Sequence, residues 1–193
     1  APVYACLSRI VFGKTIERAQ HHFLNLIKPH DQVLILGGGS GDLLRTLLKL
    51  QPHITVDYID ISPRMIALAK QKTPETAPVN FIVGSADNIP GTYSVVITNF
   101  YLDLFSTETL KRIIGKIKCH VQPDGRWLVT DFVSEKWWHK LMLWLMYRFF
   151  RIATGIEAKR LPEWQTLNDP QILEIESVKF YGSFIKSAMF RVE

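Results

Sequence analysis

Short apolar runs alternate along the chain with amphipathic stretches, and this alternation predicts strands separated by helices. Runs typical of buried strands lie at residues 32–36, 54–59, 79–83, 94–98 and 126–132. The intervening helices are expected at residues 15–27 and 42–50, after the Ser62-Pro63 pair, and after Ser106. Serine is a common helix cap and proline suits the first helical turn, so the last two starting points are well marked.

The order of these elements predicts an α/β fold, a Rossmann-like doubly wound sheet that is mostly parallel. Two further strand-like stretches, 177–181 and 184–192, meet at Gly182-Ser183 and predict an antiparallel C-terminal edge. A length of 193 residues suits one domain. We expect a single unit 1–193, with a helical segment (1–30), a core (31–132), an amphipathic helix and loop (133–170) and edge strands (171–193).

The segment from about residue 135 to 153 has helical periodicity. Its apolar positions are Trp138, Leu141, Leu145, Phe149 and Ile152, and a second face carries Lys136, Lys140, Tyr147 and Arg151. These charges interrupt the apolar run before it reaches the roughly 18 residues that a membrane-spanning helix needs. Two interpretations remain open: a cover helix packed on the domain, and a lid whose residues 136–152 contact a membrane surface or a lipophilic acceptor.

Composition and charge exclude several classes of protein. A hydrophobic content of 47% with 21% charged residues is ordinary for a globular domain. The net charge of +5 is typical of a solvated cationic face, so no nucleic-acid partner is expected. Cys6 and Cys119 form no CxxC, and no histidine pair has metal-ligand spacing, so no metal is expected. Arg9 and Lys14 interrupt the apolar N-terminal stretch, which favours a cytoplasmic protein over a secreted one.

The first candidate site is the glycine-rich turn Gly37-Gly-Gly-Ser-Gly41, which directly follows a predicted strand. Glycines at such a turn let the backbone approach a ligand closely. The dinucleotide fingerprint GxGxxG fails here, because Asp42 or Leu44 occupies the position of its last glycine. The GK[ST] of a phosphate-binding loop is also missing, and Asp42 would repel a phosphate. A ligand without a phosphate at this turn is therefore favoured, and an NAD(P)-dependent oxidoreductase is disfavoured.

The second candidate is Asp60, which ends the second predicted strand nineteen positions after Gly41. A carboxylate at this spacing can accept hydrogen bonds from both hydroxyls of a ribose. The alternative is a structural aspartate that caps the strand-to-helix turn before Ser62-Pro63.

Five segments in order resemble the class I S-adenosylmethionine-dependent methyltransferases. The segments are VLILGGGSG (33–41), YIDISPRMIALA (58–69), FIVGSADNIP (81–90), YSVVITNFYLDLF (93–105) and VQPDGRWLVTDF (121–132). The resemblance covers most of residues 31–132. It implies a seven-stranded sheet with an antiparallel edge and S-adenosylmethionine as the cofactor.

The resemblance also implies which residues contact the cofactor. They are Gly37, Gly38, Gly39, Asp60, Ile61, Ser85, Ala86 and Asn99. The three glycines would pass beneath the methionine part, Asp60 would hold the ribose and Ile61 would pack on the adenine. Ser85 and Ala86 stand where the family contacts the adenine edge, and Asn99 stands where it contacts the methionine moiety.

Two positions depart from the family pattern. Ile35 stands where an acidic residue commonly precedes the first glycine by two positions, and Ser85 stands where an aspartate often contacts the adenine amino group. These departures are the evidence for an alternative function, a non-catalytic cofactor-binding or interaction protein on the same fold.

No catalytic triad is expected, because the sulfonium already carries an activated methyl group and the protein mainly aligns the acceptor. A general base is needed only where the acceptor loses a proton, and the candidates near strand ends are Tyr101, Asp103 and Asp131. Asp103 and Asp131 are equally well explained as structural carboxylates. The residues after Asn99 lack the Pro-Pro pair of nucleic-acid amino-methyltransferases, and Phe132 does not fit a catechol-type metal site. The sequence predicts methylation of a small apolar or aromatic molecule and carries no signal for an oligomeric state.

Overall fold

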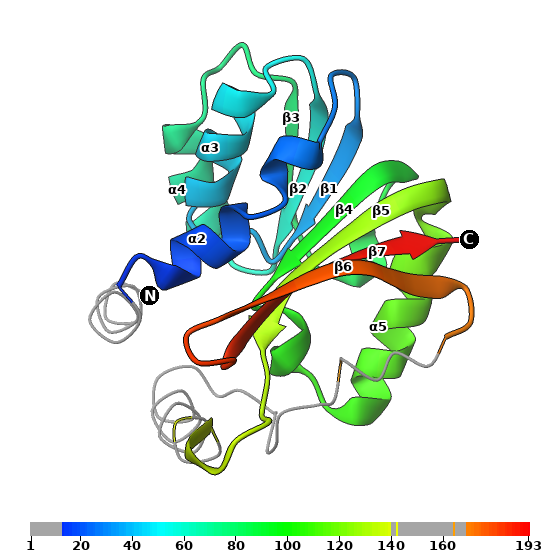
Figure 1. Cartoon of the computed structure of the whole chain (residues 1–193). Coiled ribbons are helices and arrows are strands. Elements are labelled where there is room, and N and C mark those ends of the chain that lie inside the picture. Colours follow the sequence, from blue (N-terminus) through cyan, green and yellow to red (C-terminus); the bar gives the residue numbers. More distant parts are fainter. Residues whose placement is uncertain (1–12, 140–141, 143–163, 165–168) are drawn as a thin grey trace.

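Seven strands form one sheet in the order β3-β2-β1-β4-β5-β7-β6 (Figure 1). The computed structural model describes residues 13–139, 142, 164 and 169–193. The strands are β1 (Gln32–Leu36), β2 (Thr55–Asp60), β3 (Val79–Val83), β4 (Tyr93–Asn99), β5 (Val121–Phe132), β6 (Ile172–Phe180) and β7 (Ile185–Val192). The first five strands pair in parallel, whereas β7 pairs antiparallel with both β5 and β6. The predicted fold class and its antiparallel edge are confirmed.

Strand β1 lies between β2 and β4, so the order of the strands reverses at this point. Ligands of open α/β sheets bind in the crevice at the carboxyl ends of the strands beside such a reversal. Three connections start at these ends, from β1 to α3, from β2 to α4 and from β4 to α5. The topology therefore brings the glycine turn, Asp60 and the residues after Asn99 together at the carboxyl ends of the strands.

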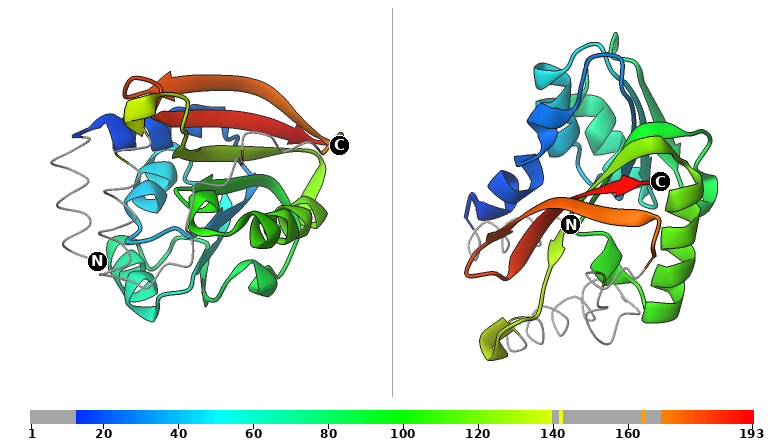
Figure 2. Two further views of the ribbon diagram at one scale, coloured as in Figure 1. Left: turned by 90° about the horizontal axis from the view of Figure 1, so that it is seen from below. Right: turned by 45° about the vertical axis from the view of Figure 1, so that its right-hand side comes forward.

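Helices cover both faces of the sheet, which is strongly twisted in all the views of Figures 1 and 2. One face carries α2 (Thr15–His21), the short 3-10 helix η1 (Leu24–Leu26), α3 (Asp42–Leu50) and α4 (Pro63–Lys72), and the other carries α5 (Thr107–Cys119). Two further 3-10 helices, η2 (Ala86–Asn88) and η3 (Leu102–Leu104), lie in the connections on either side of β4. Leu44 and Val33 pack in the first core, and Ile114 and Trp127 pack in the second.

The predicted helix starts are confirmed in atomic detail. The Ser62 hydroxyl accepts a hydrogen bond from the Met65 N–H at the start of α4, with Pro63 in the first turn. The Ser106 hydroxyl accepts one from the Thr109 N–H at the start of α5. Each cap satisfies a backbone donor that the helix itself leaves without a partner.

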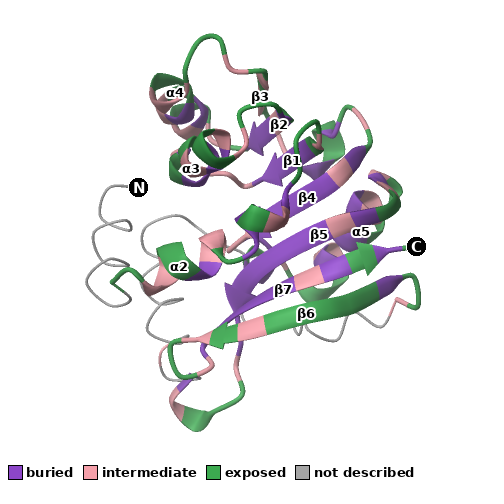
Figure 3. Ribbon diagram, turned by 45° about the horizontal axis from the view of Figure 1, so that its top comes forward, coloured by how far each residue is buried: buried purple, intermediate pink, exposed green. Residues whose placement is uncertain are grey.

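Three element boundaries differ from the prediction by more than two residues. The first helix ends at His21 and is followed by the separate turn η1. Strand β5 begins at Val121, so Pro123-Asp-Gly125 is an irregularity inside the strand, where Asp124 has a φ of 58°. Strand β6 begins five residues earlier than predicted, at Ile172, and its residues are mostly exposed (Figure 3). An edge strand needs no continuous apolar run, which is why the pattern does not reveal its start.

The amphipathic segment after β5 lies mostly outside the described residues. Trp137, Trp138, His139 and Met142 are helical, whereas Glu135 and Lys136 precede the helix, so the helix begins two residues later than predicted. Residues 140–141 and 143–153 and most of the 155–170 loop lie outside the described residues. Membrane contact through residues 136–152 therefore stays a prediction. In the part of the chain that the structure describes, no helix combines the length and apolar character needed to cross a bilayer.

Candidate functional site

The glycine turn joins β1 to α3 in a conformation that other residues rarely adopt. Gly37, Gly39 and Gly41 have φ values of 66°, 65° and 82°. Only glycine reaches this left-handed region without a steric cost. The Gly37 N–H donates to the Ile59 carbonyl of β2 across 2.9 Å, so the turn is tied to the neighbouring strand.

Gly38 is the position where the turn has least room. A Cβ added to Gly38 would lie 2.2 Å from Cζ of Tyr58, a fully buried residue of β2. The Tyr58 hydroxyl in turn donates to the Gly39 carbonyl across 2.9 Å. Burial raises the pKa of Tyr58, so its phenol stays protonated and keeps this bond. The Tyr58 side chain therefore stabilises the glycine turn by packing against Gly38 and by its hydrogen bond to Gly39.

Asp60, the last residue of β2, connects the glycine turn to the start of α4. Its Oδ2 accepts the Gly39 N–H at 2.8 Å, and its Oδ1 accepts the Ser62 N–H at 2.9 Å. Of the two roles that the sequence left open, the structure shows the turn cap, and the role of ligand acceptor stays a prediction. Next to it, Ile61 is 77% exposed, which is unusual for an isoleucine and leaves a bare apolar surface beside Asp60.

The end of β3 brings Ser85 and Ala86 to the same edge of the sheet. The Ser85 hydroxyl accepts the Asp87 N–H at 3.2 Å, and Asn88 Oδ1 accepts the Ser85 N–H at 3.0 Å. Ser85 is thus occupied in capping η2. Ala86 is buried, and the Asp87 carboxylate forms ion pairs with Lys116 and Arg112 of α5. Asp87 therefore connects η2 to α5 through its carboxylate.

The residues that follow β4 pack against the glycine turn. The Tyr101 ring packs so near Gly37 that a Cβ there would lie 2.5 Å from Tyr101 Cδ2. The Tyr101 hydroxyl lies beside the backbone N–H of Ala86, and burial raises the pKa of Tyr101 to about 12. A phenol with this pKa keeps its proton at neutral pH, so Tyr101 is placed as a wall and hydrogen-bonding group between Gly37 and Ala86 rather than as a base.

Two buried carboxyl groups, Asp103 and Asp131, lie at the segment that follows β4. Asp131 is fully buried, and its Oδ2 accepts the N–H groups of Leu102 and Asp103 at 2.9 and 3.3 Å. Its Oδ1 accepts the Phe132 N–H at 2.8 Å. Burial raises the pKa of Asp103 to about 7, and burial together with the charge of Asp103 raises the pKa of Asp131 well above its usual range. Two such groups cannot both ionise freely at neutral pH, so the pair holds a proton.

The raised pKa of Asp103 predicts a pH-dependent stability. The folded chain binds more protons than the unfolded chain between the ordinary pKa of 3.8 and about 7, so the free energy of unfolding falls as the pH rises through this window. Asp103→Asn stays neutral and escapes this loss. Relative to wild type, the variant should gain about 2–3 kcal/mol between pH 5 and pH 8. Urea unfolding of both proteins across this range measures the difference, and parallel curves would contradict it.

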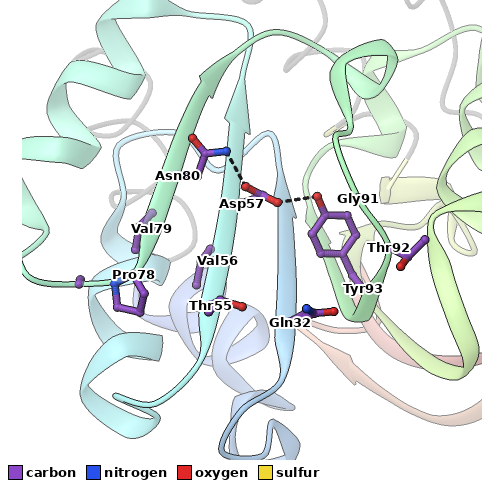
Figure 4. Close-up of a pocket in the computed structure, with 11 residues that line it drawn as sticks. Gln32, Thr55, Val56, Asp57, Pro78, Val79, Asn80, Gly91, Thr92 and Tyr93 are labelled. Atoms are coloured by element: carbon purple, nitrogen blue, oxygen red, sulfur yellow. Dashed lines mark hydrogen bonds between the residues drawn. The ribbon is translucent and has the colours of Figure 1, made fainter.

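A hollow of about 620 Å³ lies elsewhere, at the amino ends of β1 to β4 (Figure 4). Asp57 accepts hydrogen bonds there from the Tyr93 hydroxyl at 2.6 Å and from the Asn80 amide at 2.7 Å. These bonds join β2 to β3 and β4 near the amino ends of the strands, away from Asp60 at the carboxyl end of β2. Within the described ranges, no group of three His, Cys, Asp or Glu side chains is placed to hold a metal ion.

The structure brings most of the predicted site positions together at the carboxyl ends of the strands, with Asp103 and Asp131 next to them. These positions are Gly37–Gly39, Asp60, Ile61, Ser85, Ala86, Asn99 and Tyr101. Sequence reasoning missed Tyr58, because a tyrosine in a buried strand gives no signal of its bond to Gly39. Ile35, the first departure from the family pattern, is 1% exposed and packs in the core with the residues of α3.

A parallel sheet with an antiparallel edge, a glycine turn after β1 and an acidic residue ending β2 define a Rossmann-like methyltransferase fold. Residues 33–125 match the family model described as a methyltransferase domain. This match over just under half of the chain, together with the fold, supports the resemblance to the class I S-adenosylmethionine-dependent methyltransferases.

Two curated relatives and one solved structure illustrate this similarity. A malonyl-[acyl-carrier protein] O-methyltransferase of Halalkalibacterium halodurans is 26% identical over 52% of this chain and 38% of its own length. A demethylmenaquinone methyltransferase of Thermus thermophilus is 29% identical over 68% of this chain and 62% of its own length. The magnesium protoporphyrin IX methyltransferase of Synechocystis superposes with a TM-score of 0.71 at 18% identity, covering 96% of this chain and 85% of that one. The chain thus spans less than two thirds of either curated relative.

Proposed function

We propose that this chain binds S-adenosylmethionine at the carboxyl edge of β1, β2 and β4 and transfers its methyl group to a small apolar or aromatic molecule. The observation that carries the proposal is the Asp60 carboxylate, which is fixed by the N–H groups of Gly39 and Ser62. Each carboxylate oxygen has a further lone pair that can accept a ribose hydroxyl. The match to the methyltransferase family model and the similarity of the fold support the same cofactor.

The residues around Asp60 fit the rest of an adenosyl sulfonium ligand. Ile61 offers an exposed apolar surface on which an adenine can pack, and the glycine turn lacks side chains that would block the methionine part. Asn99 adds a buried side-chain amide, Nδ2, that has no hydrogen-bond partner among the described residues and can donate to a carboxylate. When bound, S-adenosylmethionine supplies an activated methyl group, and the protein's task is to orient the acceptor and exclude water.

Thermal unfolding with four ligands tests this proposal. S-adenosylmethionine and S-adenosylhomocysteine are expected to stabilise the protein, by about 2.7 kcal/mol at a hundred times the dissociation constant. NAD and NADP should give no shift, because the turn lacks the dinucleotide fingerprint. Stabilisation by NAD or NADP alone would instead favour an oxidoreductase, and no stabilisation by any ligand would refute the proposal.

A non-catalytic cofactor-binding protein is the second candidate. Two observations favour it: Ser85 is occupied in capping η2, and Ile35 replaces an acidic residue. Transfer of a radiolabelled methyl group from S-adenosylmethionine to a panel of phenols, quinols and amines separates the two functions. Cofactor binding without transfer to any of them would favour this candidate.

A further inference from the structure

The turn that follows β4, residues 99–105, combines several features that a purely structural turn does not need. Of the side-chain atoms in the described residues, two are buried without a hydrogen-bond partner, and both belong to this turn: Asn99 Nδ2 and Asp103 Oδ1. Phe100 adopts a left-handed φ of 51°, which is costly for an aromatic residue. Orphaned polar atoms and backbone strain persist where function requires them.

The two carboxyl groups at this turn differ in their hydrogen bonding. Both oxygens of Asp131 are held by backbone N–H groups, one from its own strand and two from η3. Asp103 is only 6% exposed, yet its Oδ1 accepts no hydrogen bond from the described part of the chain. Asp131 therefore fixes the turn, whereas Asp103 presents a free lone pair. A buried carboxyl oxygen without a partner costs about 1–3 kcal/mol, which a ligand that donates a hydrogen bond would recover.

The free oxygen belongs to the same edge of the sheet as the proposed cofactor site. Tyr101, two residues before Asp103, packs on Gly37 of the glycine turn, and Asn99 ends the strand beside β1. The turn thus follows directly from residues that line the site.

The charge of the pair restricts what can bind. Asp103 and Asp131 titrate together, and burial keeps one proton on the pair at neutral pH. Because the pKa of Asp103 is about 7, this pair carries a negative charge in part of the molecules at neutral pH and in more of them as the pH rises, in surroundings of low polarity where charges interact strongly. A second carboxylate brought to this place would be repelled, whereas a neutral O–H or N–H group would be attracted.

We propose that Asp103 is the proton acceptor of the methyl-transfer reaction, and that the acceptor molecule is a neutral O–H or N–H compound rather than a carboxylate. In this step the acceptor atom forms a bond to the methyl carbon while the carbon–sulfur bond breaks, and its electron pair stays on sulfur. The proton of the acceptor goes to Asp103 Oδ1. The products are the methylated acceptor and S-adenosylhomocysteine. This inference rests on the proposed function and deepens it by naming the substrate class.

Binding of two matched probes to the protein saturated with S-adenosylhomocysteine tests the inference. The probes are 1-naphthol and 1-naphthoate, which share a ring system and differ in carrying an O–H or a carboxylate. Calorimetry at pH 7 should show that wild type binds naphthol about tenfold or more tightly than naphthoate. Asp103→Asn is nearly isosteric and uncharged, so it should reduce this preference to about threefold or less while S-adenosylhomocysteine affinity stays within about twofold.

Asp124→Asn is the matched control, because Asp124 is exposed in β5 and asparagine tolerates its left-handed conformation. This control should keep the wild-type preference for naphthol. The inference is overturned if wild type binds naphthoate as well as naphthol, if it binds neither probe while binding S-adenosylhomocysteine, or if the preference survives in Asp103→Asn. Failure to bind S-adenosylhomocysteine at all is a different result, since it refutes the proposed function and this inference with it.

Discussion

Gly38→Ala is expected to abolish measurable binding of S-adenosylhomocysteine and to destabilise the fold by about 3 kcal/mol or more. The added Cβ would lie 2.2 Å from Tyr58 Cζ and 2.5 Å from its hydroxyl oxygen, and this ring is fully buried in β2. Either the ring or the glycine turn must move, and the bond from Tyr58 to the Gly39 carbonyl is lost. Urea unfolding and calorimetric titration measure the two effects.

Gly115→Ala is the matched control for this substitution. Gly115 lies within α5, where an added Cβ would meet nothing within 4 Å. Alanine is the better helix former, so this variant should gain about 0.5–1 kcal/mol and keep its ligand affinity. If Gly38→Ala retained wild-type affinity, the glycine turn would not be the cofactor site.

Asp60→Asn is expected to weaken S-adenosylhomocysteine binding by about a hundredfold or more and to lower the free energy of unfolding by about 1–3 kcal/mol. An amide has one oxygen and one NH2 group, so it cannot accept the N–H groups of both Gly39 and Ser62 through separate oxygens. The remaining acceptor sites for the ribose hydroxyls are reduced at the same time. Calorimetry of ligand binding and urea unfolding report the two losses separately.

Asp57→Asn provides the matched control on the same strand. Asp57 lies three residues before Asp60, at the opposite edge of the sheet, where it accepts bonds from Tyr93 and Asn80. This variant should lose stability to a similar extent but keep its affinity for S-adenosylhomocysteine. Equal loss of affinity in both variants would show that the effect of Asp60→Asn comes from the sheet and not from ligand contacts.

The order and bounds of the central elements could be predicted because strands that are buried on both faces consist of consecutive apolar residues. Strands β1 and β3 and helix α3 have the predicted bounds, and Ser62 and Ser106 cap helices as expected. The pattern fails where burial is one-sided or absent. Exposed β6 begins earlier than its apolar content suggests, and the bulge at Pro123-Asp-Gly125 resembles a turn because bulges and turns favour the same residues.

The site was predictable where a single segment carries the chemistry and not where distant segments must meet. The glycine turn and Asp60 stand out by residue type and spacing alone. The contact of Tyr58 with Gly38 and Gly39 depends on the register of β2 against β1, which the sequence does not display. The pairing of Asp131 with the N–H groups of Leu102 and Asp103 spans 29 and 28 positions, so only the folded chain reveals it.

Strand β6 has a consequence for the behaviour of the protein at high concentration. Within the described residues it ends the sheet, so one side of its backbone has no neighbouring strand there, and Leu173 and Ile175 are exposed along it. A bulge between Glu174 and Glu176 interrupts its regular geometry, and the ion pair of Glu174 with Lys186 places charge beside it. Such irregularities and charges are the features by which natural edge strands hinder intermolecular strand pairing.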